Sequence, residues 1–108
     1  MSQLTFEDFK KCELKVAVVL DAQEIPGADR LWRLTVDVGS EKKEIVAGVK
    51  LWYDKEALIG KRIVVVNNLA PAVIRGVESR GMLLAAKEGQ EFGLLTVDKP
   101  LPPGSVVG

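Results

Sequence analysis

Residues 63–86 read IVVVNNLAPAVIRGVESRGMLLAA, in which two short apolar runs enclose a polar segment. The first run, residues 63–66, consists entirely of β-branched side chains, and the second covers residues 82–86. Each run is shorter than an ordinary helix, and β-branched residues favour strands. Both runs are therefore predicted to be buried strands.

The segment between the two runs combines polar side chains with two glycines. Gly76 and Gly81 permit backbone conformations that other residues resist. The polar side chains are Asn67, Asn68, Arg75, Glu78, Ser79 and Arg80. Held between rigid strands, such cations, amides and hydroxyls could form a recognition surface, and a solvated connection is the alternative.

The N-terminal part of the chain predicts a helix and two strands. Thr5 and Asp8 have the spacing of a capping box, so a short helix is expected from Phe6, with Phe6 and Phe9 facing the core. Residues 13–25 alternate like a strand, and the expected core-facing side chains are Leu14, Val16, Val18, Leu20 and Ala22. In the second strand the core set is Trp32, Leu34, Val36 and Val38, and Arg33 is expected to face water.

The remaining elements complete a recognisable order. A third strand is expected at residues 44–49, then a helix at 55–58 capped by Asp54 and ended by Gly60, and a fourth strand at 61–66. Three strands, a short helix and two more strands is the order of an OB-fold, an all-β, five-stranded, partly open barrel. Beyond it, residues 87–93 are expected to turn, 94–97 to form a short strand, and 101–104 to leave the sheet. The prediction is one domain, residues 1–108, with an N-terminal helix and a C-terminal extension.

Composition narrows the classes of function. The chain has 108 residues with 15 basic and 15 acidic side chains, one cysteine and no histidine. Histidine-based triads and the usual zinc sites are therefore excluded, and we expect a binding module without cofactor or metal, not an enzyme. No apolar run approaches the roughly 20 residues that span a bilayer, so no membrane association and a cytoplasmic location are expected.

The stretch NLAPAVIRGVESRGMLLAA resembles the signature of a known tRNA-binding domain. This domain occurs in a free-standing dimeric tRNA-binding protein, at the C-terminus of methionyl-tRNA synthetases and in the endothelial monocyte-activating polypeptide. Three further stretches fit the same family: DFKKCELKVAVVLDA (8–22), IPGADRLWRLTVDVG (25–39) and EIVAGVKLWYDKEALIGKRIVVV (44–66). The resemblance covers nearly the whole chain and implies the OB-fold.

The resemblance also implies tRNA-contacting residues. Arg30 stands where the family usually has lysine, and Lys15 where it often has arginine, so both charges are kept. Residues that match as they stand are Asn68, Arg75, Ser79 and Met82. The family commonly has alanine, lysine, a basic residue and glutamine at the positions of Asn67, Ala70, Val73 and Arg80, respectively. Because the chain is neutral overall, phosphate binding requires its cations to gather on one face. The predicted site is Lys15, Arg30, Arg33, Asn68, Arg75, Ser79, Arg80 and Met82.

Each of these assignments has a simpler alternative. Arg30 and Arg75 could be solvated surface cations, Met82 a core filler and Ser79 a turn residue. Trp32 is assigned to the core because it lies on the apolar face of its strand, and the role of Trp52 is left open.

The resemblance implies a homodimer that recognises the outer corner of folded tRNA without reading its sequence. The partners expected are tRNA, a second copy and a methionyl-tRNA synthetase, with the N-terminal helix and the segment after Ala86 as the dimer interface. The chain begins with Met1 and is expected to be complete, although a C-terminal piece of a synthetase would look the same. The alternatives are a peptide-binding chaperone similar to the CsaA secretion protein, which shares the dimeric fold, and a general single-strand binder.

Overall fold

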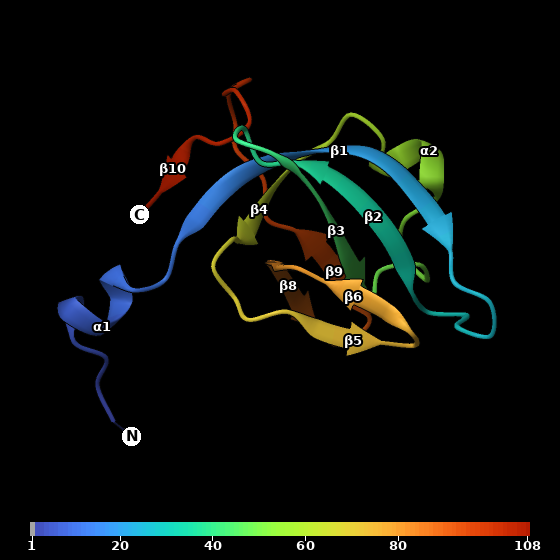
Figure 1. The fold of residues 1–108 in the computed structure, drawn as a ribbon, viewed down its shortest axis with the longest axis horizontal. Helices are drawn as coiled ribbons and strands as arrows, with labels where there is room; N and C mark the ends of the chain where they lie inside the picture. Colours follow the sequence, from blue (N-terminus) through green and yellow to red (C-terminus); the bar gives the residue numbers. More distant parts are fainter. Residues whose placement is uncertain (1) are drawn as a thin grey trace.

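The computed structural model of the chain describes residues 2–108 and is dominated by antiparallel strands. Its elements are α1 (Phe6–Lys10), β1 (Leu14–Glu24), β2 (Trp32–Asp37), β3 (Lys42–Ala47), α2 (Lys55–Leu58), β4 (Arg62–Val66), β5 (Ala72–Ile74), β6 (Val77–Ser79), β7 (Met82–Leu83), β8 (Ala85–Glu88), β9 (Glu91–Leu94) and β10 (Val106–Val107). The main sheet has the order β3-β2-β1-β4-β7, with β10 paired to the start of β1. The pairs β5–β6 and β8–β9 are separate hairpins (Figure 1).

The barrel closes where the segment after β6 meets β3. The Arg80 backbone N–H donates to the Glu44 carbonyl at 2.9 Å, and the Val46 N–H donates to the Ser79 hydroxyl at 2.9 Å. The result is a nearly closed barrel of five antiparallel strands, which confirms the predicted OB-type fold. The β5–β6 hairpin is thereby held beside the outer edge of the sheet.

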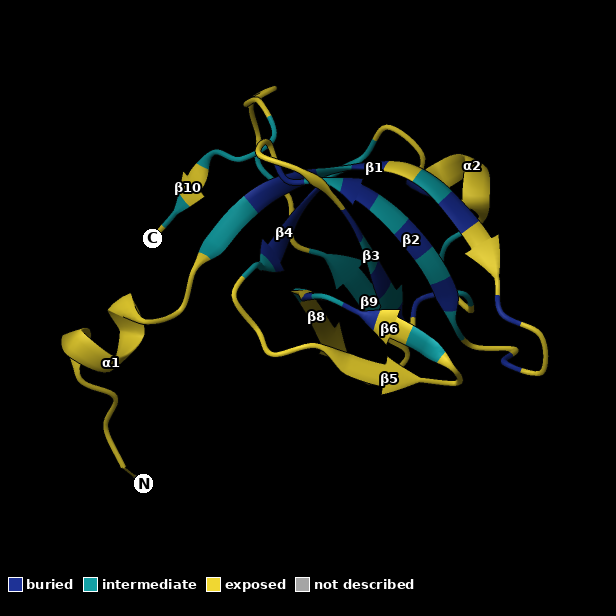
Figure 2. Ribbon diagram, viewed as in Figure 1, coloured by how far each residue is buried: buried dark blue, intermediate teal, exposed yellow. Residues whose placement is uncertain are grey.

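Alternation in β2 fills the barrel as the sequence predicts. Trp32, Leu34 and Val36 are buried, and the residues between them are only half-buried. The fully buried large aliphatic side chains include Leu34, Ile45, Leu58 and Ile63, which come from β2, β3, α2 and β4 (Figure 2). Burying each such side chain contributes about 1.5–3 kcal/mol to stability, so the strands that carry the surface loops are firmly anchored.

The predicted alternation in β1 is wrong in the middle of the strand, although Val16 and Ala22 are buried as predicted. The pairing of β1 with β2 shifts between Val19 and Asp21, which is the mark of a β-bulge. The bulge changes which side chains share a face, so Ala17 and Val19 join Ala22 in the core, while Leu20 is 38% exposed. A β-bulge of one residue cannot be recognised in a sequence where the side chains on both faces of the strand are apolar.

Helix α1 begins as predicted but packs differently. The Thr5 hydroxyl accepts a hydrogen bond from the Asp8 N–H at 3.1 Å, which confirms the cap. However, Phe6 is 70% exposed and Phe9 is 38% exposed, so the prediction that they face the core is wrong. Figure 1 shows the reason, because α1 projects away from the barrel on an extended arm. Helix α2 has the predicted bounds and follows Asp54, although the Asp54 side chain makes no capping hydrogen bond.

The segment after Ala86 forms a hairpin in place of the predicted turn followed by a strand at residues 94–97. Its strands β8 and β9 flank a turn at Gly89, and the second strand ends at Leu94. Phe92 stacks on Trp52 with ring centroids 4.4 Å apart, and the Tyr53 hydroxyl accepts a hydrogen bond from the Leu94 N–H at 3.1 Å. These contacts with a distant segment fix the hairpin, which is why local turn residues alone gave the wrong bounds.

Candidate nucleic-acid interface

The tip of the β5–β6 hairpin presents Arg75 to solvent. Arg75 and Gly76 have φ angles of 53° and 79°, so the two strands are joined by a tight two-residue turn. Within residues 2–108, Arg75 is the one residue other than glycine with positive φ. Such a conformation is disfavoured for a side chain as long as arginine, and residues of this kind concentrate at functional sites. The turn therefore holds a cation at an exposed and conformationally strained position.

Arg75 shares a surface hollow with Arg30, which is distant from it in sequence. Both arginines line a surface hollow of about 350 Å³ whose other walls come from residues 27–31. Neither takes part in a salt bridge with any residue of the described chain. The nearby Lys50 differs, because it pairs with Glu24 at 2.7 Å, and its hydrogen bond lowers the pKa of the Glu24 carboxyl. Arg30 and Arg75 thus line one hollow without an ion pair to a described residue, although Asp29 also contributes a carboxylate to its lining.

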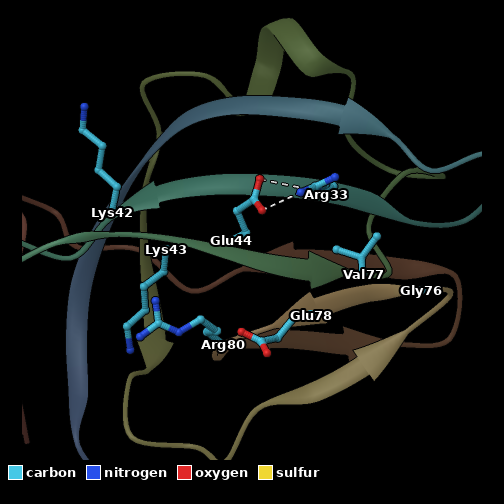
Figure 3. Close-up of a pocket in the computed structure, with 8 residues that line it drawn as sticks. All are labelled: Arg33, Lys42, Lys43, Glu44, Gly76, Val77, Glu78 and Arg80. Carbon is cyan, nitrogen blue, oxygen red and sulfur yellow. Dashed lines mark hydrogen bonds and ion pairs between the residues drawn. The ribbon is translucent and has the colours of Figure 1, made fainter.

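A second hollow, of about 370 Å³, is lined by residues of β2, β3 and the β5–β6 hairpin (Figure 3). Its charged lining residues are Arg33, Lys42, Lys43, Glu44, Glu78 and Arg80. The Arg33 guanidinium donates to both oxygens of Glu44, at 3.0 Å through Nε and 2.6 Å through Nη2. This ion pair raises the pKa of Arg33, which stays charged at any physiological pH. Arg80 pairs less closely, with its Nη1 at 3.3 Å from Glu41 Oε1.

Lys43 is a functional candidate that the sequence prediction missed. Its side chain is on the core-facing side of β3, opposite Val36, and the residue is only 9% exposed. The Nζ atom donates to the Asn67 carbonyl at 2.8 Å. Lys43 therefore holds the β4–β5 loop at the end of the barrel. The sequence did hold one signal for this role. In the alternating pattern of β3, Lys43 stands at a position where an apolar, core-facing residue is expected.

Two predicted contact residues have their polar groups engaged inside the protein. Ser79 is 4% exposed, and its hydroxyl accepts from the Val46 N–H and donates to the Gly81 carbonyl at 3.1 Å. Asn68 accepts from the Glu13 N–H at 2.9 Å and donates to the Lys11 carbonyl at 2.6 Å. Both side chains therefore support the loop and the arm, and a direct contact of either with RNA stays a prediction.

The two hydrogen bonds of Asn68 lead to a testable prediction about the arm that carries α1. Asn68→Ala removes both hydrogen bonds to residues 11–13, so the arm should lose its fixed direction while the barrel remains folded. Because each bond contributes about 1 kcal/mol, the free energy of unfolding should fall by about 1–2 kcal/mol. Amide hydrogen exchange should show faster exchange at residues 9–13 and unchanged protection in β2. Unchanged exchange along the arm would show that Asn68 does not hold it.

The two remaining predicted residues lie apart from the hairpin tip. Lys15 lines a different hollow, which it shares with Lys10, Lys11 and Asn68 at the base of the arm. Met82 begins β7 opposite Val66 and is 47% exposed. The structure thus gathers Arg30, Arg33, Arg75 and Arg80 around one hairpin, but it places Lys15 and Met82 elsewhere.

The two tryptophans are both occupied within the protein. Trp32 is 8% exposed and donates from its indole N–H to the Tyr53 carbonyl, which confirms its assignment to the core. Trp52 has Phe92 stacked against its ring at 4.4 Å and the Lys87 ammonium 5.3 Å from its centroid. Both contacts compete with a stacked base and give Trp52 a structural role, although the residue is still 36% exposed.

Two further kinds of feature are absent from the part of the chain that the structure describes. Residues 2–108 hold no cluster of three potential metal ligands. The helices within that range are also too short and too polar to cross a membrane.

Comparison with known proteins places these features in a family. The family model described as "Putative tRNA binding domain" matches residues 14–106, which include all the strands except the last residue of β10. The chain belongs to this tRNA-binding domain family. Methionine–tRNA ligase of Thermotoga maritima is 51% identical over 104 residues, which are 96% of this chain. The chain spans only 16% of the length of that relative.

Solved structures show the same fold in chains of similar size. A methionyl-tRNA synthetase related protein from Pyrococcus horikoshii has a TM-score of 0.93 and 35% identity, with all of both chains covered. The chaperone CsaA from Bacillus anthracis has a TM-score of 0.89 and 30% identity, covering 99% of this chain and 100% of that one. The domain therefore occurs both as a part of long synthetases and as a chain of its own.

Proposed function

We propose that this domain binds folded tRNA through the cationic surface around the β5–β6 hairpin. The observation that supports the proposal most strongly is the meeting of Arg30 and Arg75 in one hollow, where neither is neutralised by an ion pair in the described chain. Arg33 and Arg80 line the second hollow, which is also bordered by the β5–β6 hairpin. We infer the class of ligand, tRNA, from the match to the tRNA-binding domain family.

The side chains of this surface suit recognition of shape more than of sequence. Arginine contacts to phosphates position a nucleic acid but carry no sequence information. The aromatic rings that could stack on bases, Trp32 and Trp52, are engaged within the protein. We therefore expect contacts to the sugar–phosphate backbone at the outer corner of tRNA, where the fold of the molecule is exposed and no anticodon is read.

A second copy of the chain is the partner that we propose for the arm. Exposed apolar side chains gather on and near α1: Leu4 and Phe6 are each 70% exposed, and Phe9 is 38% exposed. On β10, Val106 is 81% exposed. A two-fold pair that buries these side chains would double the number of arginines offered to one tRNA. Association with a methionyl-tRNA synthetase and a cytoplasmic location fit the same role.

Binding of total tRNA, compared with single-stranded RNA of equal length across a salt series, tests the proposal. We expect preference for folded tRNA and an affinity that falls steeply with salt, by a slope of about 0.9 per phosphate bound. The solution mass measured in the same samples should correspond to two chains. No preference for tRNA would contradict the proposed ligand, and a single-chain mass would contradict the proposed dimer without affecting the ligand.

One observation favours a peptide-binding chaperone as a second candidate. Residues 69–74 form an apolar stretch in which Leu69 is 46% exposed, Val73 is 73% exposed and Ile74 is 37% exposed. The CsaA chaperone of Bacillus anthracis has a closely similar fold. Suppression of aggregation of an unfolded client, together with RNA binding that hardly changes with salt, would favour this candidate over tRNA.

A further inference from the structure

The arginines of the hollow beside β3 are held by carboxylates of the chain itself. Arg33 uses two of its five N–H donors on Glu44, and Arg80 uses one on Glu41. Lys43 uses one of three donors on the Asn67 carbonyl. The remaining donors of Arg33 and Arg80 are left for another acceptor at a surface hollow of about 370 Å³, whereas Lys43 is buried on the core-facing side of β3.

We propose that this hollow is a phosphate-binding subsite and that Glu44 limits its affinity by competing for Arg33. The inference rests on the proposed tRNA-binding function, which it extends by assigning an inhibitory role to an acidic residue. A phosphate group presents the same pair of acceptor oxygens as a carboxylate and accepts the same bidentate bonds from a guanidinium. Glu44 therefore occupies the position in which a phosphate oxygen would bind.

The Arg33–Glu44 pair is weak enough to be exchanged. The two side chains are 38% and 40% exposed, and exposed ion pairs contribute little net stability because water and salt screen them. A bound phosphate would accept from Arg33 at the expense of Glu44, whose negative charge would remain close by. That charge repels the phosphate whether or not the carboxylate swings away, so it lowers affinity in both arrangements.

The cations of the hollow are not equivalent. Figure 3 shows Lys42 extending away from Lys43 and Arg80, while Arg33 and Glu44 meet on the outer face of β2 and β3. Glu78 adds a second carboxylate to the lining, but it forms no hydrogen bond or ion pair with the hollow's arginines among the residues that the structure describes. Removal of the Glu44 carboxylate therefore frees N–H donors of Arg33 most directly.

The test compares tRNA binding by the full chain and four variants: Glu44→Gln, Arg33→Gln, the double variant Arg33→Gln/Glu44→Gln, and Glu56→Gln. Glu56 lies exposed on α2 and does not line the hollow, so Glu56→Gln makes the same change in net charge at an unrelated place. Glu44→Gln should bind total tRNA about three- to tenfold more tightly than Glu56→Gln, with a salt slope steeper by about one. In the Arg33→Gln background, the gain should disappear.

Two results of the tRNA-binding comparison would overturn the proposal. One is an affinity of Glu44→Gln no higher than that of Glu56→Gln, and the other is a gain that survives the loss of Arg33. Inorganic tripolyphosphate, titrated against the same variants, separates this proposal from the proposed function. If the wild-type chain failed to bind tRNA, the proposed function would fall, yet tighter tripolyphosphate binding by Glu44→Gln that depends on Arg33 would still support the anion subsite. Equal tripolyphosphate affinities of Glu44→Gln and Glu56→Gln would overturn it.

Discussion

Replacing Arg30 and Arg75 together by alanine is expected to weaken tRNA binding by about 30-fold at low salt. A hydrogen-bonded interaction between a charged pair contributes about 1.5–3 kcal/mol, and exposure to solvent reduces this to about 1 kcal/mol for each arginine. Because both residues line one hollow, they should bind neighbouring phosphates. The salt slope should flatten by about one for each arginine–phosphate interaction that the substitutions remove. Filter binding or fluorescence anisotropy across a salt series measures both quantities.

A charge-matched control separates this local effect from a general loss of positive charge. Lys55→Ala/Lys99→Ala removes two exposed cations that line neither hollow, so it should change tRNA affinity by less than about threefold. Arg75→Gly is a second control for folding, because glycine relieves the positive φ of 53° while removing the cation. Its stability should not fall although its affinity does. Equal losses in the arginine and lysine pairs would remove Arg30 and Arg75 from the site.

Gly81→Val is expected to destabilise the fold by about 2–4 kcal/mol. Gly81 has a φ of +155°, a conformation that side chains rarely adopt, and a Cβ atom there would lie 3.1 Å from the Val66 carbonyl oxygen and 3.4 Å from Ile45. The Gly81 carbonyl also accepts the hydrogen bond from the Ser79 hydroxyl at 3.1 Å. Valine would therefore disturb the point at which the loop returns to the barrel.

Denaturant unfolding of Gly81→Val and Gly93→Val checks this prediction. Gly93 lies in β9, has no positive φ, and has no atom within 4 Å of the position where a Cβ would stand. The Gly93 variant should unfold at nearly the same denaturant concentration as the wild type, and the Gly81 variant at a clearly lower one. The same midpoint for both variants would show that the backbone at Gly81 tolerates a side chain.

The fold was predictable because its main strands show clear local patterns. The alternation of β2, the cap at Thr5 and the bounds of α2 all agree with the structure. The bulge in β1 was not predictable, because Ala17 and Val19 are as apolar as the residues predicted to face inward. Phe6 was misplaced because an apolar helix residue is ordinarily buried, whereas this helix lies on an arm outside the barrel.

The candidate site was only partly predictable, because pairing between side chains depends on register. The sequence identified Arg33 and Arg80 as cations, but it did not show that they form ion pairs with Glu44 and Glu41. Nor did local sequence show that Ser79 is buried or that Lys43 reaches the Asn67 carbonyl from the core-facing side of β3. The burial of Ser79 follows from the meeting of β3 with the end of β6, which joins segments more than 30 residues apart.

An NMR titration of the isotopically labelled chain with folded tRNA tests the proposed interface most directly. We predict that amide signals and arginine Nε–H signals shift first at residues 27–31, 42–44 and 75–80, around the β5–β6 hairpin. Signals of α2 and of the β8–β9 hairpin should remain in place. Shifts concentrated on β8, β9 or α2, with the hairpin tip unaffected, would contradict the proposed interface and place the tRNA on another face of the barrel.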